Sequence, residues 1–295
     1  MKQNRLFSFL AIFLIYVIAT AISYFSVYFI AQKFELSLYI KILIADVIGT
    51  IVVFIFSLIF NNASCYDPYW SVAPIVIVIY LLIKFEFNVT NLLVSIAVIG
   101  WGIRLTANWA YTFQNLTCED WRYVNLKKQS KSLYFFVNFF GIHMMPTMIV
   151  YLCMLPVMFM FNNPVSFNAL VVVFFVLAIC AFTMQGVADY QMHKFRKNKN
   201  GTFNRNGLWK YSRHPNYLGE ISMWWMVALL AISALGGYWF LVVGASVNTL
   251  LFIFISIPLA EKHQKVRKPG FDEYKSETRM LFPIYKSPKD KKVES

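Results

Sequence analysis

The sequence predicts an all-α fold, a polytopic bundle of seven or eight transmembrane helices that forms one membrane domain over residues 1–295. Composition is the first reason: 59% of the residues are hydrophobic and only 14% are charged. Soluble domains carry roughly 25% charged residues. The second reason is that several apolar runs reach the roughly 20 residues needed to cross a hydrocarbon core of about 30 Å. Charged or Asn-, Gly- and Pro-containing connectors separate these runs, as expected for loops between spans.

Three runs contain no charged residue and are the clearest spans: Leu6–Ile30, Phe167–Ala188 and Tyr238–Ala260. The first has an apolar stretch longer than the roughly 7–15 residues of a signal peptide, and no small-residue cleavage site follows it. We therefore expect it to be a retained span.

Five further runs are either interrupted by an ionisable residue or short. They are Ile42–Phe60 with Asp46, Trp70–Ile83, Asn91–Phe113 with Arg104, Tyr134–Phe161 with His143, and Tyr217–Leu235 with Glu220. Trp70–Ile83 is short for a span, so the predicted count is seven or eight. Ionisable residues inside spans are costly and are by default candidates for function. Asp46 and His143 each stand alone in their run, and we interpret both as structural.

Basic residues indicate the orientation. The connector Gln191–His214 has seven Lys or Arg and no Asp or Glu, which places it on the cytoplasmic side by the positive-inside rule. The basic C-terminal tail and Lys127, Lys128 and Lys131 fall on the same side. Bacterial inner membranes and the endoplasmic reticulum both orient proteins this way. The net charge of +13 fits attraction to anionic membrane lipids, and we expect no nucleic-acid partner.

Two common kinds of site are not expected. The four cysteines have no paired spacing, so no metal site is predicted. No G-x-G-x-x-G motif follows a predicted strand, which excludes a Rossmann site. Any bound nucleotide would have to lie among helices, and we expect the protein to be a monomer.

Polar residues gather on one helix face near the cytoplasmic edge. Gln185, Asp189, His193 and Arg196 follow one another at intervals of four, four and three, which places them on the same side of a helix. That face leaves the membrane on the side of the basic connector.

Two later helices add polar groups at the same edge. Pro215 is suited to the first turn of a helix, and Asn216 and Glu220 then share a face one turn apart. His263 and Arg267 repeat the spacing of four beyond the last span. Arginine pairs bidentately with phosphates, and carboxylates and amides suit ribose and amide groups. The edge is therefore predicted to bind a phosphate-bearing nucleotide.

Several motifs resemble the C-terminal catalytic domain of the steroid 5-alpha-reductase family and its membrane relatives. The C-terminal matches are Ala188-Asp189-Tyr190-Gln191, GLWKYSRHPNYLGE at 207–220, GFDEY at 270–274 and Phe282-Pro283. The N-terminal matches, which look like the membrane relatives in particular, are YDPYWS at 66–71, WGIRL at 101–105 and EDWRY at 119–123. Isoprenylcysteine carboxyl methyltransferases share Arg-His-Pro-x-Tyr, but the preceding Asp-Tyr and the following Leu-Gly-Glu favour the reductases.

The resemblance implies a helix bundle that binds NADPH from the cytosolic side and reduces a carbon–carbon double bond conjugated to a carbonyl. It implies that residues 185–285 form the cofactor-binding half and that the substrate is an apolar lipid or steroid-like molecule from the bilayer. The implied cofactor-binding residues are Gln185, Asp189, Tyr190, Arg196, Arg205, Arg213, His214, Asn216, Tyr217, Glu220, His263, Arg267, Arg104, Asn108 and Arg122.

The residues that would hold the substrate carbonyl depart from the family pattern. The steroid enzymes use a Glu and a Tyr, whereas here Asp67 is the nearest substitute for the Glu and Trp101 stands at the place of the Tyr. A carboxylic acid kept neutral by burial can donate a hydrogen bond to a developing enolate. The candidate catalytic proton donors are therefore Asp67, Tyr66 and Tyr69.

Two other functions remain open. An S-adenosylmethionine-dependent methyltransferase of the isoprenylcysteine carboxyl type would use Arg213-His214-Pro215 and the Glu-containing tail to hold its cofactor. A transporter or scaffold without chemistry would use the intramembrane charges as a substrate path, although no internal repeat supports it. Binding of NADPH or of S-adenosylmethionine separates all three.

Overall fold

The computed structural model describes residues 4–198 and 202–282, and its regular structure there is helical, without a β-strand. Eight helical segments in these ranges are long and apolar enough to cross a membrane: Arg5–Lys33, Leu38–Ile59, Ala63–Lys84, Val89–Thr112, Trp121–Asn162, Ala169–Asn198, Pro215–Leu235 and Trp239–Arg267. The predicted helical membrane fold is confirmed, and the chain is an integral, multi-pass membrane protein. Residues 283–285, at the end of the expected cofactor-binding half, lie outside the described residues. They include Pro283 of the Phe282-Pro283 match.

The helices follow one another in a simple order. The first half of the chain contains α1 (Arg5–Lys33), α2 (Leu38–Ile59), the 3-10 turn η1 (Ala63–Tyr66), α3 (Tyr69–Lys84), α4 (Val89–Thr112), α5 (Trp121–Ser130), η2 (Lys131–Leu133) and α6 (Tyr134–Phe136). The second half contains the π-helix η3 (Val137–Met144), α7 (Met145–Asn162), α8 (Ala169–Asn198), η4 (Gly207–Lys210), α9 (Pro215–Leu235), η5 (Trp239–Val242), α10 (Val243–Leu251), the π-helix η6 (Phe252–Ser256), α11 (Ile257–Arg267) and α12 (Phe271–Glu277).

The run that looked short in the sequence is a full span. The turn η1 precedes α3, so the helical segment Ala63–Lys84 has 22 residues. Asn62 begins it by accepting a hydrogen bond from the backbone N–H of Ser64 at 2.8 Å. The polar residues before Tyr69 resemble a loop in sequence, but this cap and the 3-10 turn extend the segment. The part of the chain that the structure describes therefore contains eight candidate spans, the upper of the two predicted values.

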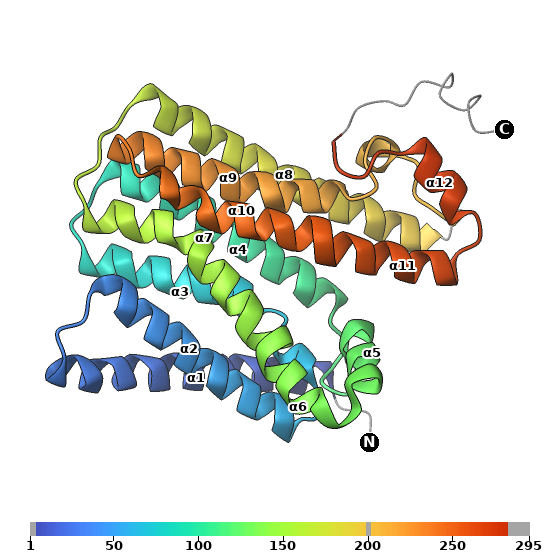
Figure 1. Ribbon diagram of the computed structural model, residues 1–295, viewed down its shortest axis with the longest axis horizontal. Helices are drawn as coiled ribbons and strands as arrows, with labels where there is room; N and C mark the ends of the chain where they lie inside the picture. Colours follow the sequence, from blue (N-terminus) through green and yellow to red (C-terminus); the bar gives the residue numbers. More distant parts are fainter. Residues whose placement is uncertain (1–3, 199–201, 283–295) are drawn as a thin grey trace.

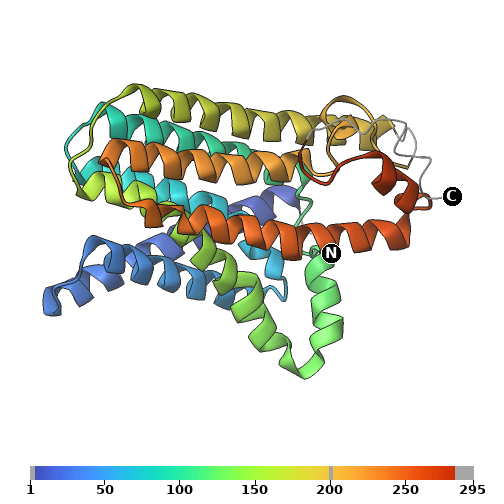
Figure 2. The same cartoon turned by 45° about the horizontal axis from the view of Figure 1, so that its top comes forward.

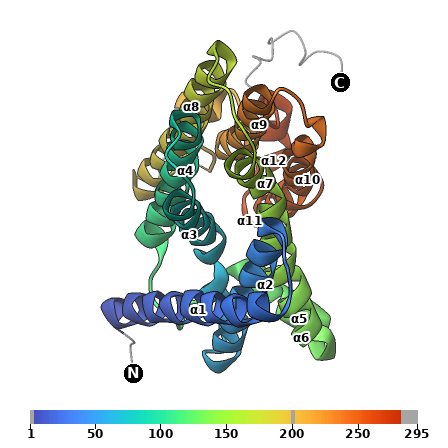
Figure 3. The same ribbon diagram turned by 90° about the vertical axis from the view of Figure 1, so that its left-hand side faces the viewer.

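The helices pack as an upper and a lower group with α7 between them (Figure 1). The helices α8 and α9 lie side by side in the upper group, and α1 and α2 lie together in the lower group. Figure 3 looks along the bundle and shows α1 running across the view, so α1 is inclined to the other spans. The central position of α7 agrees with its burial: Met154, Val157 and Met158 are each fully buried.

The outer surface of the bundle is apolar, as a lipid solvent requires. On α1, Leu6, Phe13 and Phe29 are each more than half exposed. Because every helix satisfies its own backbone hydrogen bonds, these faces can lie in hydrocarbon without unpaired polar groups.

One end of the bundle collects most of the positive charge. It is the end where α1 begins, α8 ends, α9 begins and α11 ends. Figure 2 shows α5 forming a V there with the long helix that runs from α6 through η3 into α7. The basic residues at this end include Lys127, Lys128, Lys194, Arg196, Lys197, Lys265 and Arg267. We call it the basic end. The opposite end, where α1 joins α2 and α3 joins α4, is called the far end.

Candidate functional site

A close contact between α8 and α9 creates the polar site. Gly219 on α9 faces α8, and a Cβ atom placed there would lie 2.7 Å from the backbone oxygen of Ala181 and 2.8 Å from Cβ of Gln185. Real Cβ atoms do not approach other atoms so closely. A glycine at this position therefore allows the two helices to touch and brings Gln185 against Glu220.

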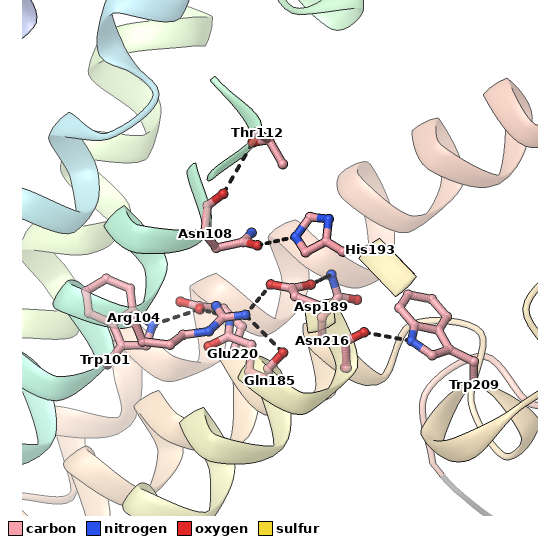
Figure 4. Close-up of polar contacts among 11 residues, drawn as sticks. Trp101, Arg104, Asn108, Thr112, Gln185, Asp189, His193, Trp209, Asn216 and Glu220 are labelled. Atoms are coloured by element: carbon pink, nitrogen blue, oxygen red, sulfur yellow. Dashed lines mark hydrogen bonds and ion pairs between the residues drawn. The ribbon is translucent and has the colours of Figure 1, made fainter. Parts of the chain in front are cut away.

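Glu220 is the centre of a buried hydrogen-bond cluster. Its side chain is 2% exposed and accepts bonds from three donors on three helices. Trp101 Nε1 and Gln185 Nε2 donate to Oε2 at 2.8 and 2.6 Å, and Trp224 Nε1 donates to Oε1 at 2.9 Å (Figure 4 shows the first of these pairs). Buried acceptors are normally paired in this way because an unpaired one loses its hydration without compensation. The cluster thus locks α4, α8 and α9 together.

One turn closer to the basic end, Arg104 of α4 pairs with Asp189 of α8 (Figure 4). Arg104 also donates to the backbone oxygen of Gln185 at 2.9 Å, and Asn216 Nδ2 donates to Asp189 Oδ1 at 3.2 Å. Both charged side chains are 14% exposed. Two polar atoms of this group, Arg104 Nη1 and Gln185 Oε1, are buried without a hydrogen-bond partner among the described residues. A bound molecule with an acceptor and a donor would satisfy them.

A cavity of about 550 Å³ lies beside the ion pair, between α4 and α8. It is lined by Arg104, Asn108, Tyr111, Gly186, Asp189, Tyr190, His193, Lys194, Lys197 and Asn198. His193 Nε2 lies 2.8 Å from Asn108 Oδ1, and its ring packs 4.8 Å from that of Tyr111. The Arg104–Asp189 pair is neutral overall, so the two lysines give the cavity a net positive charge.

A second cluster lies at the start of α9 and contains other predicted cofactor residues. Arg213 Nη2 pairs with Glu261 Oε1 at 2.8 Å, and His214 Nε2 lies 3.2 Å from the same oxygen. Arg213 also donates to the backbone oxygens of Lys275 and Thr278. These contacts tie the segment between η4 and α9 to α11, to α12 and to the residue that follows α12. Arg213 and His214 are thus engaged within the protein and lie apart from the cavity lining.

Burial lowers the pKa of His214 below its ordinary value of 6.5, and the bond to Glu261 opposes this shift only in part. As the pH falls, the His214 imidazole is therefore protonated in the unfolded chain before it is protonated in the folded protein. This protonation favours the unfolded chain, so the stability that neutral His214 contributes is present above pH 6.5 and is lost below it. We expect the thermal midpoint to fall between about pH 7 and about pH 5.5, more steeply in the wild-type protein than in His214→Gln. Equal slopes in the two proteins would contradict this assignment.

A third group surrounds α5. Arg122 pairs with Asp120 at 2.8 Å, and the Tyr123 hydroxyl donates to Asp67 Oδ1 at 2.6 Å. The ring of Trp121 stacks on that of His263 with centroids 3.6 Å apart. These contacts join α5 to α11 and to the segment before α3.

Tyr217 lies on the first turn of α9, next to Asn216, which binds Asp189. Its ring stacks on that of His214, with centroids 5.3 Å apart. The start of α9 therefore lies against both the Arg104–Asp189 pair and the Arg213–Glu261 cluster.

Five predicted cofactor residues are exposed: Arg122, described above, and Tyr190, Arg196, Arg205 and Arg267. Tyr190 lines the cavity and is 67% exposed. Arg205 pairs with Glu277 at 3.0 Å, whereas Arg196 and Arg267 point outward at the basic end and do not line the cavity.

The three candidate proton donors face different partners. Tyr66 lies 2.7 Å from Thr147 Oγ1, Tyr69 donates to Asp46 Oδ1 at 3.1 Å, and Asp67 accepts from Tyr123. Tyr66 and Tyr69 lie side by side with ring centroids 5.4 Å apart, whereas Asp67 faces α5. Asp46, which stands alone in its apolar run, is 6% exposed and accepts this hydrogen bond from Tyr69 of α3.

Several residues of the site were not among the predicted ones. Trp224 completes the shell of Glu220, and Lys194 and Lys197 line the cavity. The lysines follow Tyr190 at intervals of four and three, a helical spacing that the sequence contains. Trp224 follows Glu220 by four residues, so the helical repeat already places the two side chains on one face. Within residues 4–198 and 202–282, no group of three His, Cys, Asp or Glu side chains is placed to hold a metal ion.

Comparison with protein families matches residues 53–278 to a family described as a protein of unknown function, DUF1295. The chain belongs to the DUF1295 family. The DUF1295 match runs from the second half of α2 to the end of α12, so it includes the Glu220 cluster, the Arg104–Asp189 pair and the cavity beside them. It begins after Asp46 and leaves out the whole of α1. No curated protein and no solved structure matches the chain.

Proposed function

We propose that the protein is a membrane-embedded, NADPH-dependent reductase of a carbon–carbon double bond conjugated to a carbonyl in a lipid or steroid-like substrate. The observation that carries the proposal is the polar group formed by Arg104, Gln185 and Asp189 beside the positive cavity. Its two unpaired buried atoms, Arg104 Nη1 and Gln185 Oε1, offer one donor and one acceptor. The resemblance of these segments to the steroid 5-alpha-reductase family supports the same conclusion.

The residues present fit a nicotinamide nucleotide. Lys194 and Lys197 provide positive charge for phosphates, and Asp189, to which Asn216 donates a hydrogen bond, provides an acceptor for hydroxyl groups. Tyr111 and Tyr190 offer exposed aromatic surfaces at the cavity for stacking of a base. The volume of about 550 Å³ lies within the range of about 300–1,000 Å³ typical of ligand sites.

The protein's own groups would bind and orient the reactants. Bound NADPH would supply a hydride. Arg104 and Asn216 would hold the nucleotide, and the Glu220 cluster would keep Gln185 in a fixed orientation because all three of its donors are buried. A hydroxyl or carboxyl group of Tyr66, Tyr69 or Asp67 would hold the proton that neutralises the developing enolate. The apolar bundle would exclude water and admit an apolar substrate from the bilayer.

We further propose that the basic end is cytoplasmic. Its lysines and arginines support this orientation through the positive-inside rule, and NADPH would then enter from the cytosol. The orientation is the same for a bacterial inner membrane and for the endoplasmic reticulum.

Ligand-induced thermal stabilisation of the purified protein in detergent tests the proposal. We expect NADPH to raise the thermal midpoint and S-adenosylmethionine to leave it unchanged. Stabilisation by S-adenosylmethionine alone would favour a methyltransferase. No response to either compound would favour a transporter or scaffold.

The combined Lys194→Ala and Lys197→Ala variant is expected to bind NADPH about tenfold more weakly, because two partly screened phosphate contacts are lost. Titration of NADPH fluorescence measures the affinity. Lys128→Ala with Lys262→Ala is the matched control, since both lysines are exposed at the basic end outside the cavity lining. Equal NADPH affinity in the two double variants would contradict the placement of the phosphates in this cavity.

A further inference from the structure

A second cavity, of about 330 Å³, lies between α1, α2 and α3. Figure 3 shows α1 and α2 on the side of α3 away from α8. The lining of this cavity is mostly apolar and includes Ala19, Val27, Ile42, Val72 and Ile77. It shares no lining residue with the cavity between α4 and α8. An inference about it therefore does not depend on the proposed nucleotide site.

Three polar side chains from three different helices meet in this apolar lining. Ser23 comes from α1, Asp46 from α2 and Tyr69 from α3, and all three are more than nine-tenths buried. They converge on Gly49, where an added Cβ atom would collide with the Tyr69 hydroxyl and lie 3.1 Å from Ser23 Oγ. The absence of a side chain at Gly49 is what leaves room for the three groups. We call Ser23, Asp46 and Tyr69 the polar triad.

The hydrogen bonds of the polar triad are incomplete. Tyr69 donates to Asp46 Oδ1 at 3.1 Å, but Ser23 Oγ is buried without a partner among the described residues. A buried hydroxyl without a partner costs free energy, so such groups are normally satisfied by the protein or by a bound molecule. Ser23 can donate one hydrogen bond, and a carboxylate at Asp46 can accept further ones.

We propose that this cavity binds a lipid alcohol, with its hydroxyl accepting a hydrogen bond from Ser23 and donating one to Asp46 while its apolar chain fills the space between α1 and α3. A hydroxyl is the simplest group that is both donor and acceptor. A carboxylate or phosphate in the same place would lie against Asp46, which disfavours negative charge. The only basic side chains in the lining, Lys41 and Lys84, belong to the far-end parts of α2 and α3, five residues or more along the chain from the triad.

Binding of radiolabelled hexadecanol to the purified full-length protein in detergent tests the proposal, with hexadecane and palmitate as competitors. We expect unlabelled hexadecanol to displace the radiolabel at a concentration at least fivefold lower than hexadecane or palmitate does. This factor corresponds to about one hydrogen bond. Ser23→Ala is expected to weaken hexadecanol binding by about fivefold, and Asp46→Asn to weaken it as well. Ser26→Ala makes the same chemical change one turn away, outside the lining, and should leave binding unchanged.

Stability in the absence of lipid separates this role from a structural one. Because Ser23 Oγ has no partner to lose, Ser23→Ala is expected to leave the thermal midpoint unchanged or to raise it while it weakens binding. A lowered midpoint would show that the hydroxyl serves the fold and would overturn the proposal. Preference for palmitate over hexadecanol, or hexadecanol binding that is equal in Ser23→Ala and Ser26→Ala, would overturn it too. NADPH titration of the same variants reports on the nucleotide site separately.

Discussion

Replacement of Glu220 by alanine is expected to destabilise the protein by about 3–5 kcal/mol. The substitution removes the acceptor of three buried donors, the indole N–H groups of Trp101 and Trp224 and the amide of Gln185. The donors are shielded from bulk solvent, because Trp101 is 0% and Trp224 only 2% exposed. Thermal unfolding in detergent measures the effect, and a fall in the midpoint of roughly 5–10 °C is expected.

Two further variants show whether the loss of stability in Glu220→Ala comes from the hydrogen-bond donors that it leaves unpaired. Glu220→Gln keeps one acceptor oxygen and should lie between the wild type and Glu220→Ala. Glu273→Gln changes an exposed carboxylate on α12 and should shift stability by less than about 0.5 kcal/mol. A Glu220→Ala protein as stable as Glu273→Gln would show that the cluster does not hold α4, α8 and α9 together.

Substitution of Gly219 by alanine is expected to destabilise the protein by about 1–3 kcal/mol and to weaken NADPH binding. The added Cβ atom would meet the backbone oxygen of Ala181 at 2.7 Å, and a backbone atom cannot move aside as a flexible side chain does. The helices α8 and α9 must then separate, which lengthens the contacts of Gln185 with Glu220 and of Asp189 with Asn216. Thermal unfolding and NADPH titration measure the two effects.

A loss of stability in Gly219→Ala would be diagnostic of close helix packing, because alanine ordinarily forms helices better than glycine does. Gly141→Ala is the matched control: Gly141 is helical and exposed, and an added Cβ atom would have only a side-chain atom of Val137 at 4.0 Å nearby. This variant is expected to be unchanged or stabilised by up to about 1 kcal/mol. If both alanine variants gain stability, α8 and α9 are not in close contact at Gly219.

The polar face of α8 was predicted from the sequence, and the structure confirms it for some of its residues. The spacing of Gln185, Asp189 and His193 predicts a shared face, and in the structure all three interact with α4 or α9. Arg196 follows His193 by three residues and belongs to the same predicted face. It lies beyond the packed part of α8, where it is exposed. Periodicity determines which side of a helix a residue occupies, but not how far along the helix a neighbour extends.

Partners that come from distant segments were harder to predict. Asp46 stands alone in its apolar run, and nothing in the sequence identifies Tyr69 of α3 as its partner or places Ser23 of α1 beside them. Likewise, Arg213 and His214 looked available for a cofactor, whereas Glu261 of α11 engages both. In each case the partner lies more than twenty residues away along the chain.

The sequence by itself determined that the chain is a multi-pass helical membrane protein and that polar groups gather at the end of the last spans. Both conclusions depend on local properties, the length of apolar runs and the helical repeat. Only the tertiary structure decided that Glu220 joins three helices, that the Arg104–Asp189 pair borders a cavity, and that Ser23, Asp46 and Tyr69 meet at Gly49. These contacts depend on which helices are neighbours and how closely they approach. In a membrane most outward faces are equally apolar, so hydrophobic patterning does not determine either.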